Sequence, residues 1–414
     1  MKWLPTLFAA EAIPSAMITF VALLMFLQLG IGWEQSTLLC GLLTLPWVMK
    51  SFVRAKLRQL GHYSGQLRLL EVCICCQLVA LAFCFIDRSS SRWLLFVMLF
   101  VLCLFCAAHE LVARMYYEHR LTPDDQRYYN SWKMFISQST VVITYGVMIV
   151  GVGFLEVFYH NRRNVMALSW SMAVYVLAGI YLLLVVYNLF ALRSPAVSPS
   201  SPSSSFLDAM RAEVHVIDRI AHKPHWFLVV LNLALLLLPQ ALLFHSRVLL
   251  FIGSRAQGGL AASLQWIGLA QGSVGVIAFS AGLALGYWRQ MPRTSAFLLG
   301  LSPLVYWVLS HVLPQDLLSL CLAAFMAQFC FGYGLNATLP FVRYISGNRY
   351  RSTINYLYIP LISLVMLPPM AVSGWLVARL GFQTFFLLDS LLVLPAWLAA
   401  YFGFRLIREN SYFR

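Results

Sequence analysis

Charged residues are scarce in this sequence of 414 residues, and acidic ones are the scarcest. Charged side chains make up 11% of the chain, with 15 Asp and Glu against 29 Lys and Arg, whereas a soluble domain contains roughly 25%. The low charge, together with 61% apolar residues, excludes a soluble enzyme, a fibrous chain and a disordered chain. With nine cysteines in a chain of this length, a disulfide-stapled secreted domain is excluded as well.

Long apolar runs take the place of the missing charge. Segments of about 20 apolar residues are long enough to cross a bilayer as helices, and they recur along the whole length. Spans spaced this closely leave no room for a large soluble domain. We predict an all-α membrane protein with twelve transmembrane helices, at residues 4–29, 36–54, 69–86, 93–115, 131–153, 164–190, 226–251, 260–287, 295–313, 316–340, 352–378 and 383–406.

The basic residues are distributed unevenly between the connections of these spans. If the N-terminus is inside, 22 of the 29 Lys and Arg fall on the cytoplasmic side, where positive residues accumulate in membrane proteins. We therefore expect a multi-pass protein of the cell inner membrane with both termini in the cytoplasm. The first apolar run is longer than a signal peptide and contains Glu11 and Pro14, so we expect a span there rather than a cleaved leader.

One segment, residues 191–225, interrupts the pattern of spans. It contains Ser-Pro-Ser-Ser-Pro-Ser-Ser-Ser at 198–205 and a mixed-charge stretch at 208–223. We expect a flexible cytoplasmic linker followed by a short amphipathic helix. The linker would separate a six-helix bundle at 1–190 from a second bundle at 226–414, which is the architecture of the major facilitator superfamily. That architecture predicts a transporter rather than an enzyme.

The first span carries a carboxylate in apolar surroundings. Glu11 lies two turns into the span and is followed by Pro14. An acid at membrane depth is costly unless it faces a cavity or a partner. Two interpretations stay open: Glu11 lines a central cavity and binds a proton or a solute, or it pairs structurally with a basic group of a neighbouring helix.

Two short motifs resemble one branch of this superfamily. Phe8-Ala9-Ala10-Glu11-Ala12-Ile13-Pro14 in span 1 and Leu45-Pro46-Trp47-Val48-Met49-Lys50 at the end of span 2 are similar to the AmpG-type permeases, particularly those of Bacteroidetes. Weaker similarity continues at glycine motifs such as Phe331-Gly332-Tyr333-Gly334. The resemblance implies proton-coupled symport of a polar solute, such as an amino-sugar or muropeptide fragment or a siderophore-like chelate.

The sequence departs from that branch at charged positions. Arg58 stands at the position of the acid in the gating loop, and Arg114 replaces the second acid of span 4, while Glu110 keeps the first. We predict Glu110 and Arg114 on the substrate or proton pathway, and Lys50, Arg58 and His109 at the cytoplasmic gate. A structural interpretation also stands, because Glu110 and Arg114 are four residues apart and can pair on one helix face, and a lone His is often only hydrogen-bonded.

The second half offers uncharged candidates for the same pathway. Tyr333 and Asn336 in span 10 follow small glycines, and Asn355 lies in span 11. Their side chains provide hydrogen-bonding groups at membrane depth, where unsatisfied polar groups are costly. We predict that all three line the substrate pathway.

Other motifs have a structural explanation. Cys73-x-x-Cys76 and Cys103-x-x-Cys106 have the spacing of a soft-metal site, but both lie in apolar runs, so we expect neither a metal nor a disulfide. Thr122-Pro123-Asp124-Asp125 could be the acidic pair of a transferase, yet Thr, Pro and two acids also form a helix start. Gly282-x-x-x-Gly286 allows close approach of two helices.

The predicted function is a secondary active transporter that works by alternating access. We expect a monomer whose partners are a small polar solute and the lipid bilayer, with no nucleic acid and no cofactor. Two alternatives remain: a non-transporting sensor or scaffold on a transporter fold, and a polytopic membrane transferase. The lost gating acids favour the first alternative over the second.

Overall fold

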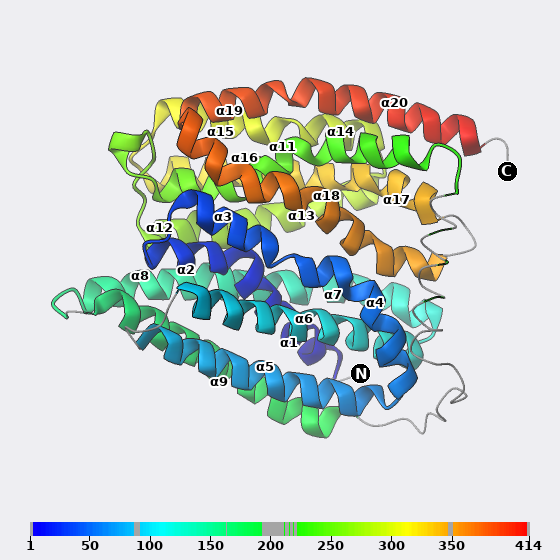
Figure 1. Cartoon of the computed structure of the whole chain (residues 1–414), viewed down its shortest axis with the longest axis horizontal. Coiled ribbons are helices and arrows are strands. Elements are labelled where there is room, and N and C mark those ends of the chain that lie inside the picture. The colour runs from blue at the N-terminus through cyan, green and yellow to red at the C-terminus, as the bar shows by residue number, and fades with distance from the viewer. Residues whose placement is uncertain are drawn as a thin grey trace. The chain divides into compact units, whose positions relative to one another are not determined.

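The structure is a computed structural model that describes residues 3–86, 92–162, 164–192, 211, 215, 218, 222–346 and 351–411. Every regular element within these residues is helical (Figure 1). The chain divides into two compact units, Met1–Ile31 with Met49–Glu213 and Gly32–Val48 with Val214–Arg414. The predicted linker and amphipathic helix at 191–225 fall almost entirely outside the described residues.

The first unit is built around α1, which packs against α6, α7 and α9. A second set of contacts joins α5 to α6 and to α9. Aromatic and aliphatic side chains of α1 and α6, among them Leu7 and Tyr116, form a buried core there. Its helices are α1 (Leu4–Ala16), which continues through a π-helical turn at Met17–Val21 into α2 (Ala22–Gln28), then α4 (Leu45–Leu60), α5 (Tyr63–Ile86), α6 (Arg92–Arg120), α7 (Pro123–Val141), α8 (Met148–Phe158) and α9 (Val165–Ala191).

The second unit has its largest interfaces between α13 and α16, between α3 and α18, and between α11 and both α18 and α20. Apolar residues of α11, among them Leu233 and Leu237, form its buried core with Phe341 and Met370. Its helices are α3 (Trp33–Leu42), α11 (Trp226–Ile252), α12 (Leu264–Ile267), α13 (Val276–Arg289), α14 (Pro292–Leu299), α15 (Leu301–Val312), α16 (Leu317–Gly334), α17 (Leu339–Ser346), α18 (Arg351–Leu380), α19 (Phe382–Leu391) and α20 (Val393–Ser411).

Eleven helical segments of the described residues are long and apolar enough to cross a membrane, which confirms the all-α membrane class. The second span differs from the prediction, because residues 36–54 do not form one helix. They are divided between α3 and α4 by a turn at Leu43 and Thr44. Pro46 lies in the first turn of α4, where its missing N–H costs nothing, and Lys50 and Arg54 make α4 more polar than the other spans.

Small residues bring two helix pairs into close contact in the second unit. A Cβ atom built on Gly282 of α13 would lie 2.2 Å from the carbonyl oxygen of Phe329 of α16, and one on Gly332 would lie 2.1 Å from that of Phe279. Between α3 and α18, a Cβ on Gly41 would lie 2.7 Å from the Cβ of Ala371. The predicted close approach at Gly282-x-x-x-Gly286 is therefore confirmed.

Candidate functional site

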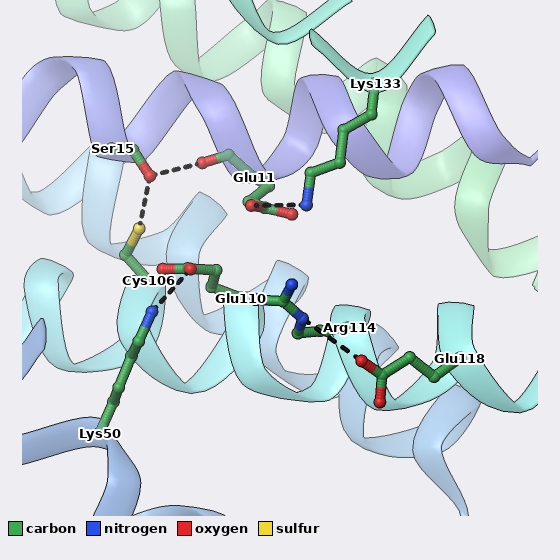
Figure 2. Close-up of polar contacts among 8 residues, drawn as sticks. All are labelled: Glu11, Ser15, Lys50, Cys106, Glu110, Arg114, Glu118 and Lys133. Carbon is green, nitrogen blue, oxygen red and sulfur yellow. Dashed lines mark hydrogen bonds and ion pairs between the residues drawn. The ribbon is translucent and has the colours of Figure 1, made fainter. Parts of the chain in front are cut away.

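The candidate site is a group of charged side chains between α1, α4, α6 and α7 of the first unit (Figure 2). Glu11 of α1 faces Lys133 of α7, with 3.6 Å between Oε1 and Nζ, and their side chains are 16% and 34% exposed. The same ammonium group lies 5.3 Å from the ring centroid of Phe8. Glu11 is therefore neither isolated nor fully sealed, since its cationic partner comes from a different helix.

A second pair lies deeper in the same unit. Lys50 of α4 donates from Nζ to Oε1 of Glu110 of α6 at 2.7 Å, and the two side chains are 3% and 11% exposed. Lys133 and Arg114 also act on Glu110 electrostatically. In water-poor surroundings a pair of this length is strongly held, because either charge alone would be costly to bury.

One further contact ties α6 to α1 next to the two ion pairs. Ser15 of α1 contacts the sulfur of Cys106 at 3.0 Å, and its hydroxyl donates to the carbonyl oxygen of Glu11 at 2.8 Å. Figure 2 shows these contacts beside the Lys50–Glu110 and Glu11–Lys133 pairs. Because Cys106 and Glu110 are one turn apart on α6, they present the same face of that helix toward α1 and α4.

Arg114 and His109 both lie beside acidic side chains. Arg114 Nε lies 3.4 Å from Oε1 of Glu118, one turn further along α6, and Arg114 also acts electrostatically on Glu110, which accepts from Lys50. His109 is buried and lies 3.4 Å from Glu71 of α5. Lys50 and Glu110 are therefore direct partners, and His109 points into a different part of the bundle. The backbone of Arg58 lies in α4, and its side chain falls outside the described residues.

The uncharged candidates of the second half are held by local contacts. The amide of Asn336 donates to the carbonyl oxygens of Tyr333 at 3.2 Å and Leu283 at 3.3 Å. Tyr333 is 6% exposed and lies where α13 and α16 approach closely. The Asn336 amide thus links the turn that follows α16 to α13. The backbone of Asn355 lies in α18, and its side chain is outside the described residues.

Sequence reasoning missed three residues of the first unit. Lys133, near the start of the predicted span 131–153, is the partner of Glu11. Glu71 and Asn188 are completely buried and in contact with each other. The available signal for Glu71 was an acid at the start of an apolar run, the same signal that identified Glu11.

The motif at Thr122 forms a helix start, which confirms that interpretation. Thr122 caps α7 by accepting a hydrogen bond from the backbone N–H of Asp125, with Pro123 at the first helical position. All nine cysteines are free thiols. Within the described residues there is no group of three or more His, Cys, Asp or Glu that could hold a metal ion. The acids at 124 and 125 are thus explained by the helix start.

The fold is similar to that of solved transporters. A bacterial homologue of the human lysosomal transporter Spinster, inward-facing and occupied, has a TM-score of 0.69 and 14% identity, covering 97% of this chain and 96% of that one. An unoccupied inward-facing structure of the same description has a TM-score of 0.66, 14% identity and coverage of 98% and 96%. A mutant of the nucleoside transporter NupG has a TM-score of 0.64, 12% identity and coverage of 97% and 99%.

These similarities define the class of the fold. The chain has the fold of the major facilitator superfamily transporters along nearly its entire length. All three structures belong to transporters. Neither a protein-family model nor a curated protein sequence matches the chain.

Proposed function

We propose that this protein is a secondary active transporter that moves a small polar solute across the inner membrane by alternating access, as a proton-coupled symporter. Two ion pairs, Glu11–Lys133 and Lys50–Glu110, are the main support for the proposal, because they lie inside a largely apolar bundle of a transporter fold. Ionisable residues within spans are rare, face the bundle interior, and mark substrate or ion pathways.

The two pairs support different roles. The Lys50–Glu110 contact is short and almost sealed from solvent, which suits a fixed element of the gate. The Glu11–Lys133 contact, at 3.6 Å and with partial exposure of both side chains, is longer than a good hydrogen bond. It can be opened at low cost, so a solute group or a proton can take the place of either partner.

The solute class follows from the resemblance in span 1 and span 2. An amino-sugar or muropeptide fragment, or a siderophore-like chelate, combines carboxylate and amide groups that could engage Lys133 and Glu11. We propose that the protein acts as a monomer of the AmpG-type branch, with both termini in the cytoplasm. These finer assignments depend on the short motifs and on the distribution of basic residues.

A solute screen followed by uptake tests the proposal. Purified protein is screened for thermal stabilisation by amino sugars, anhydro-muropeptides and ferric chelates, since a ligand that binds the native state raises the melting temperature. The stabilising solute is then offered to proteoliposomes with and without an inward proton gradient. Gradient-stimulated accumulation is expected. Binding without any accumulation would instead establish the sensor alternative.

Glu11→Gln is the decisive variant, because Gln keeps shape and hydrogen bonding but cannot ionise. We expect proton-driven uptake to fall about tenfold, equivalent to about 1.4 kcal/mol in activation free energy, with unchanged protein level. Glu409→Gln is the matched control, since Glu409 is also paired, to Arg405 at 2.7 Å, but is exposed near the end of α20. Unchanged uptake and pH dependence in Glu11→Gln would make Glu11 a structural residue.

A further inference from the structure

A second polar group lies inside the first unit, distinct from the Glu11–Lys133 and Lys50–Glu110 pairs. It consists of Thr6 of α1, Glu71 of α5, His109 of α6 and Asn188 of α9, which we call the inner polar cluster. Glu71, His109 and Asn188 have no exposed surface. Side chains of α6 and α9 therefore contact the buried carboxylate of α5, and Thr6 of α1 reaches it through Asn188.

The hydrogen bonds of the cluster converge on a single oxygen. Asn188 Nδ2 donates to Glu71 Oε1 at 2.8 Å, and His109 Nε2 lies 3.4 Å from the same oxygen. Thr6 Oγ1 donates to Asn188 Oδ1 at 2.7 Å, which turns the amide NH₂ group toward Glu71. The carboxylate thus accepts from Asn188 of α9 and contacts His109 of α6.

Three buried polar atoms around this contact have no hydrogen-bond partner among the described residues. They are Oε2 of Glu71, Nδ1 of His109 and the hydroxyl of Tyr181 on α9. Buried polar groups are ordinarily satisfied, and each exception calls for an explanation. A site that gains or loses a proton provides one, because its spare donor or acceptor capacity is used in only one of its two protonation states.

The charges around the cluster restrict its proton content. Tyr181 of α9, Cys75 of α5 and Cys106 of α6 are titratable neighbours, and all are neutral when protonated. Arg68, one turn before Glu71 on α5, donates instead to the backbone carbonyl of Leu192. His109 is the base in contact with Glu71. One proton shared between His109 Nε2 and the Glu71 carboxylate makes the cluster neutral. The neutral state is favoured because an unpaired buried charge is costly.

The same helices carry both polar groups. α1 supplies Thr6 to the inner polar cluster and Glu11 to the pair with Lys133, and α6 supplies His109 and Glu110 from consecutive positions. Consecutive residues point about 100° apart on a helix, so Glu110 faces Lys50 while His109 faces Glu71. A rotation or shift of α6 that opens the Lys50–Glu110 pair therefore also changes the His109–Glu71 contact.

We propose that the inner polar cluster is a proton-binding site, in which Glu71 and His109 share a proton whose uptake and release are linked to movement of α1 and α6. This inference rests on the proposed proton-coupled transport. In the neutral state the proton lies on His109 with Glu71 ionised, or on Glu71 with His109 neutral. Loss of that proton leaves a buried carboxylate and favours a rearrangement of α6 that brings a cation or water to Glu71.

Infrared difference spectroscopy of the purified full-length protein at two pH values tests the site without any solute. We expect a band of a protonated carboxyl group that changes with pH, disappears in Glu71→Gln and loses its pH dependence in His109→Gln. Asp389→Asn is the matched control, because Asp389 is also buried, at 1% exposure, but lies on α19 in the second unit. The pH-dependent band should persist in this control. Identical difference spectra for wild type and Glu71→Gln would overturn the proposal.

Two further measurements separate the possible failures. The double variant Glu71→Gln/His109→Gln keeps the cluster neutral and hydrogen-bonded, so it provides a folded protein without the band if Glu71→Gln alone does not fold. In proteoliposomes, Glu71→Gln should lose proton-driven uptake and retain solute exchange in the absence of a gradient. If uptake by wild type ignores the gradient while the Glu71 band remains, the proton-coupled function fails and the site stands. Proton-driven uptake by wild type without any Glu71 band overturns the site alone.

Discussion

Single residues of α6 make contacts with partners that are distant in sequence. Glu110 meets Lys50 across 60 positions, and His109 meets Glu71 across 38. Each contact joins α6 to a different neighbour, α4 in one case and α5 in the other. Polar residues of α6 therefore link it to two neighbouring helices of the first unit.

Breaking the Lys50–Glu110 pair on one side should destabilise the protein strongly. Lys50→Met leaves Glu110 buried without its closest cation, and we expect a loss of about 3 kcal/mol in the free energy of unfolding, near the lower end for a broken buried ion pair because Arg114 and Lys133 remain nearby. Unfolding in denaturant, followed by circular dichroism in detergent, measures the loss.

The double variant Lys50→Met/Glu110→Met is the control for that experiment. It removes both charges and fills the space with apolar side chains, so it should recover most of the stability lost in Lys50→Met. A double variant that is less stable than the single one would show that packing of the Lys50 stem, rather than charge balance, determines the effect.

The residues of the candidate site could be predicted only in part. Glu11 and Glu110 were identifiable because an acid within an apolar span is costly wherever the helix lies. Lys133 could not be assigned as the partner of Glu11, since their contact depends on how α1 packs against α7. The backbone contact of Asn336 could not be predicted either, because the sequence does not show which acceptors its amide meets. Its place on the substrate pathway stays a prediction.

Two helices of the second unit, α13 and α16, are in close contact at glycines. The α13–α16 interface places the backbone of Phe329 against Gly282 and that of Phe279 against Gly332. The contacts are backbone against backbone, so neither helix can accommodate a methyl group by rotating a side chain. This interface therefore fixes the separation of the two helices.

A methyl group at Gly282 should force these helices apart. We expect Gly282→Ala to lower the free energy of unfolding by about 1–3 kcal/mol, the usual cost of overpacking, and to lower the melting temperature measured by thermal aggregation. The comparison is Gly179→Ala in α9, where a Cβ would meet no atom within 4 Å. That variant should be neutral or stabilised by up to about 1 kcal/mol. Equal effects of the two substitutions would contradict the backbone contact.

Helix ends could be predicted where they depend only on residues within one turn of the chain. The start of α7 was predictable from Thr122 and Pro123, because a cap involves residues within one turn. The interruption between α3 and α4 was not, although Pro46 marks the first turn of α4. Apolar composition is similar on both sides of Leu43 and Thr44, so hydrophobicity alone predicted a single continuous span.

The overall fold and the expected orientation of the protein depend on the distribution of apolar and basic residues more than on any motif. The all-α transporter fold was predictable because recurring apolar runs of membrane length leave few other architectures. Orientation is a separate matter and stays a prediction. It depends on the 22 of 29 basic residues that fall on one side of the predicted spans.

Topology reporters test that orientation directly. A cytoplasm-active fluorescent protein fused after Arg414 should be bright, and alkaline phosphatase at the same position should be inactive, because the positive-inside rule places this end in the cytoplasm. Fusions after His160, in a connection expected outside, are the control and should give the reverse pattern. Phosphatase activity at Arg414 would require the opposite orientation of the protein.

The contact of α3 with α18 means that the chain cannot be cut between its two predicted six-helix halves without separating two helices that pack together. Thr37 Oγ1 accepts from the backbone N–H of Gly374 and donates to the carbonyl of Ala371, both at 3.2 Å, and α3 accordingly belongs to the second compact unit while its neighbours in sequence belong to the first. A cut at 191–225 would therefore leave α3 on the amino-terminal fragment and its binding surface on the carboxyl-terminal one. The carboxyl-terminal fragment, expressed alone, would therefore lack part of its own unit, and only the amino-terminal fragment could supply it.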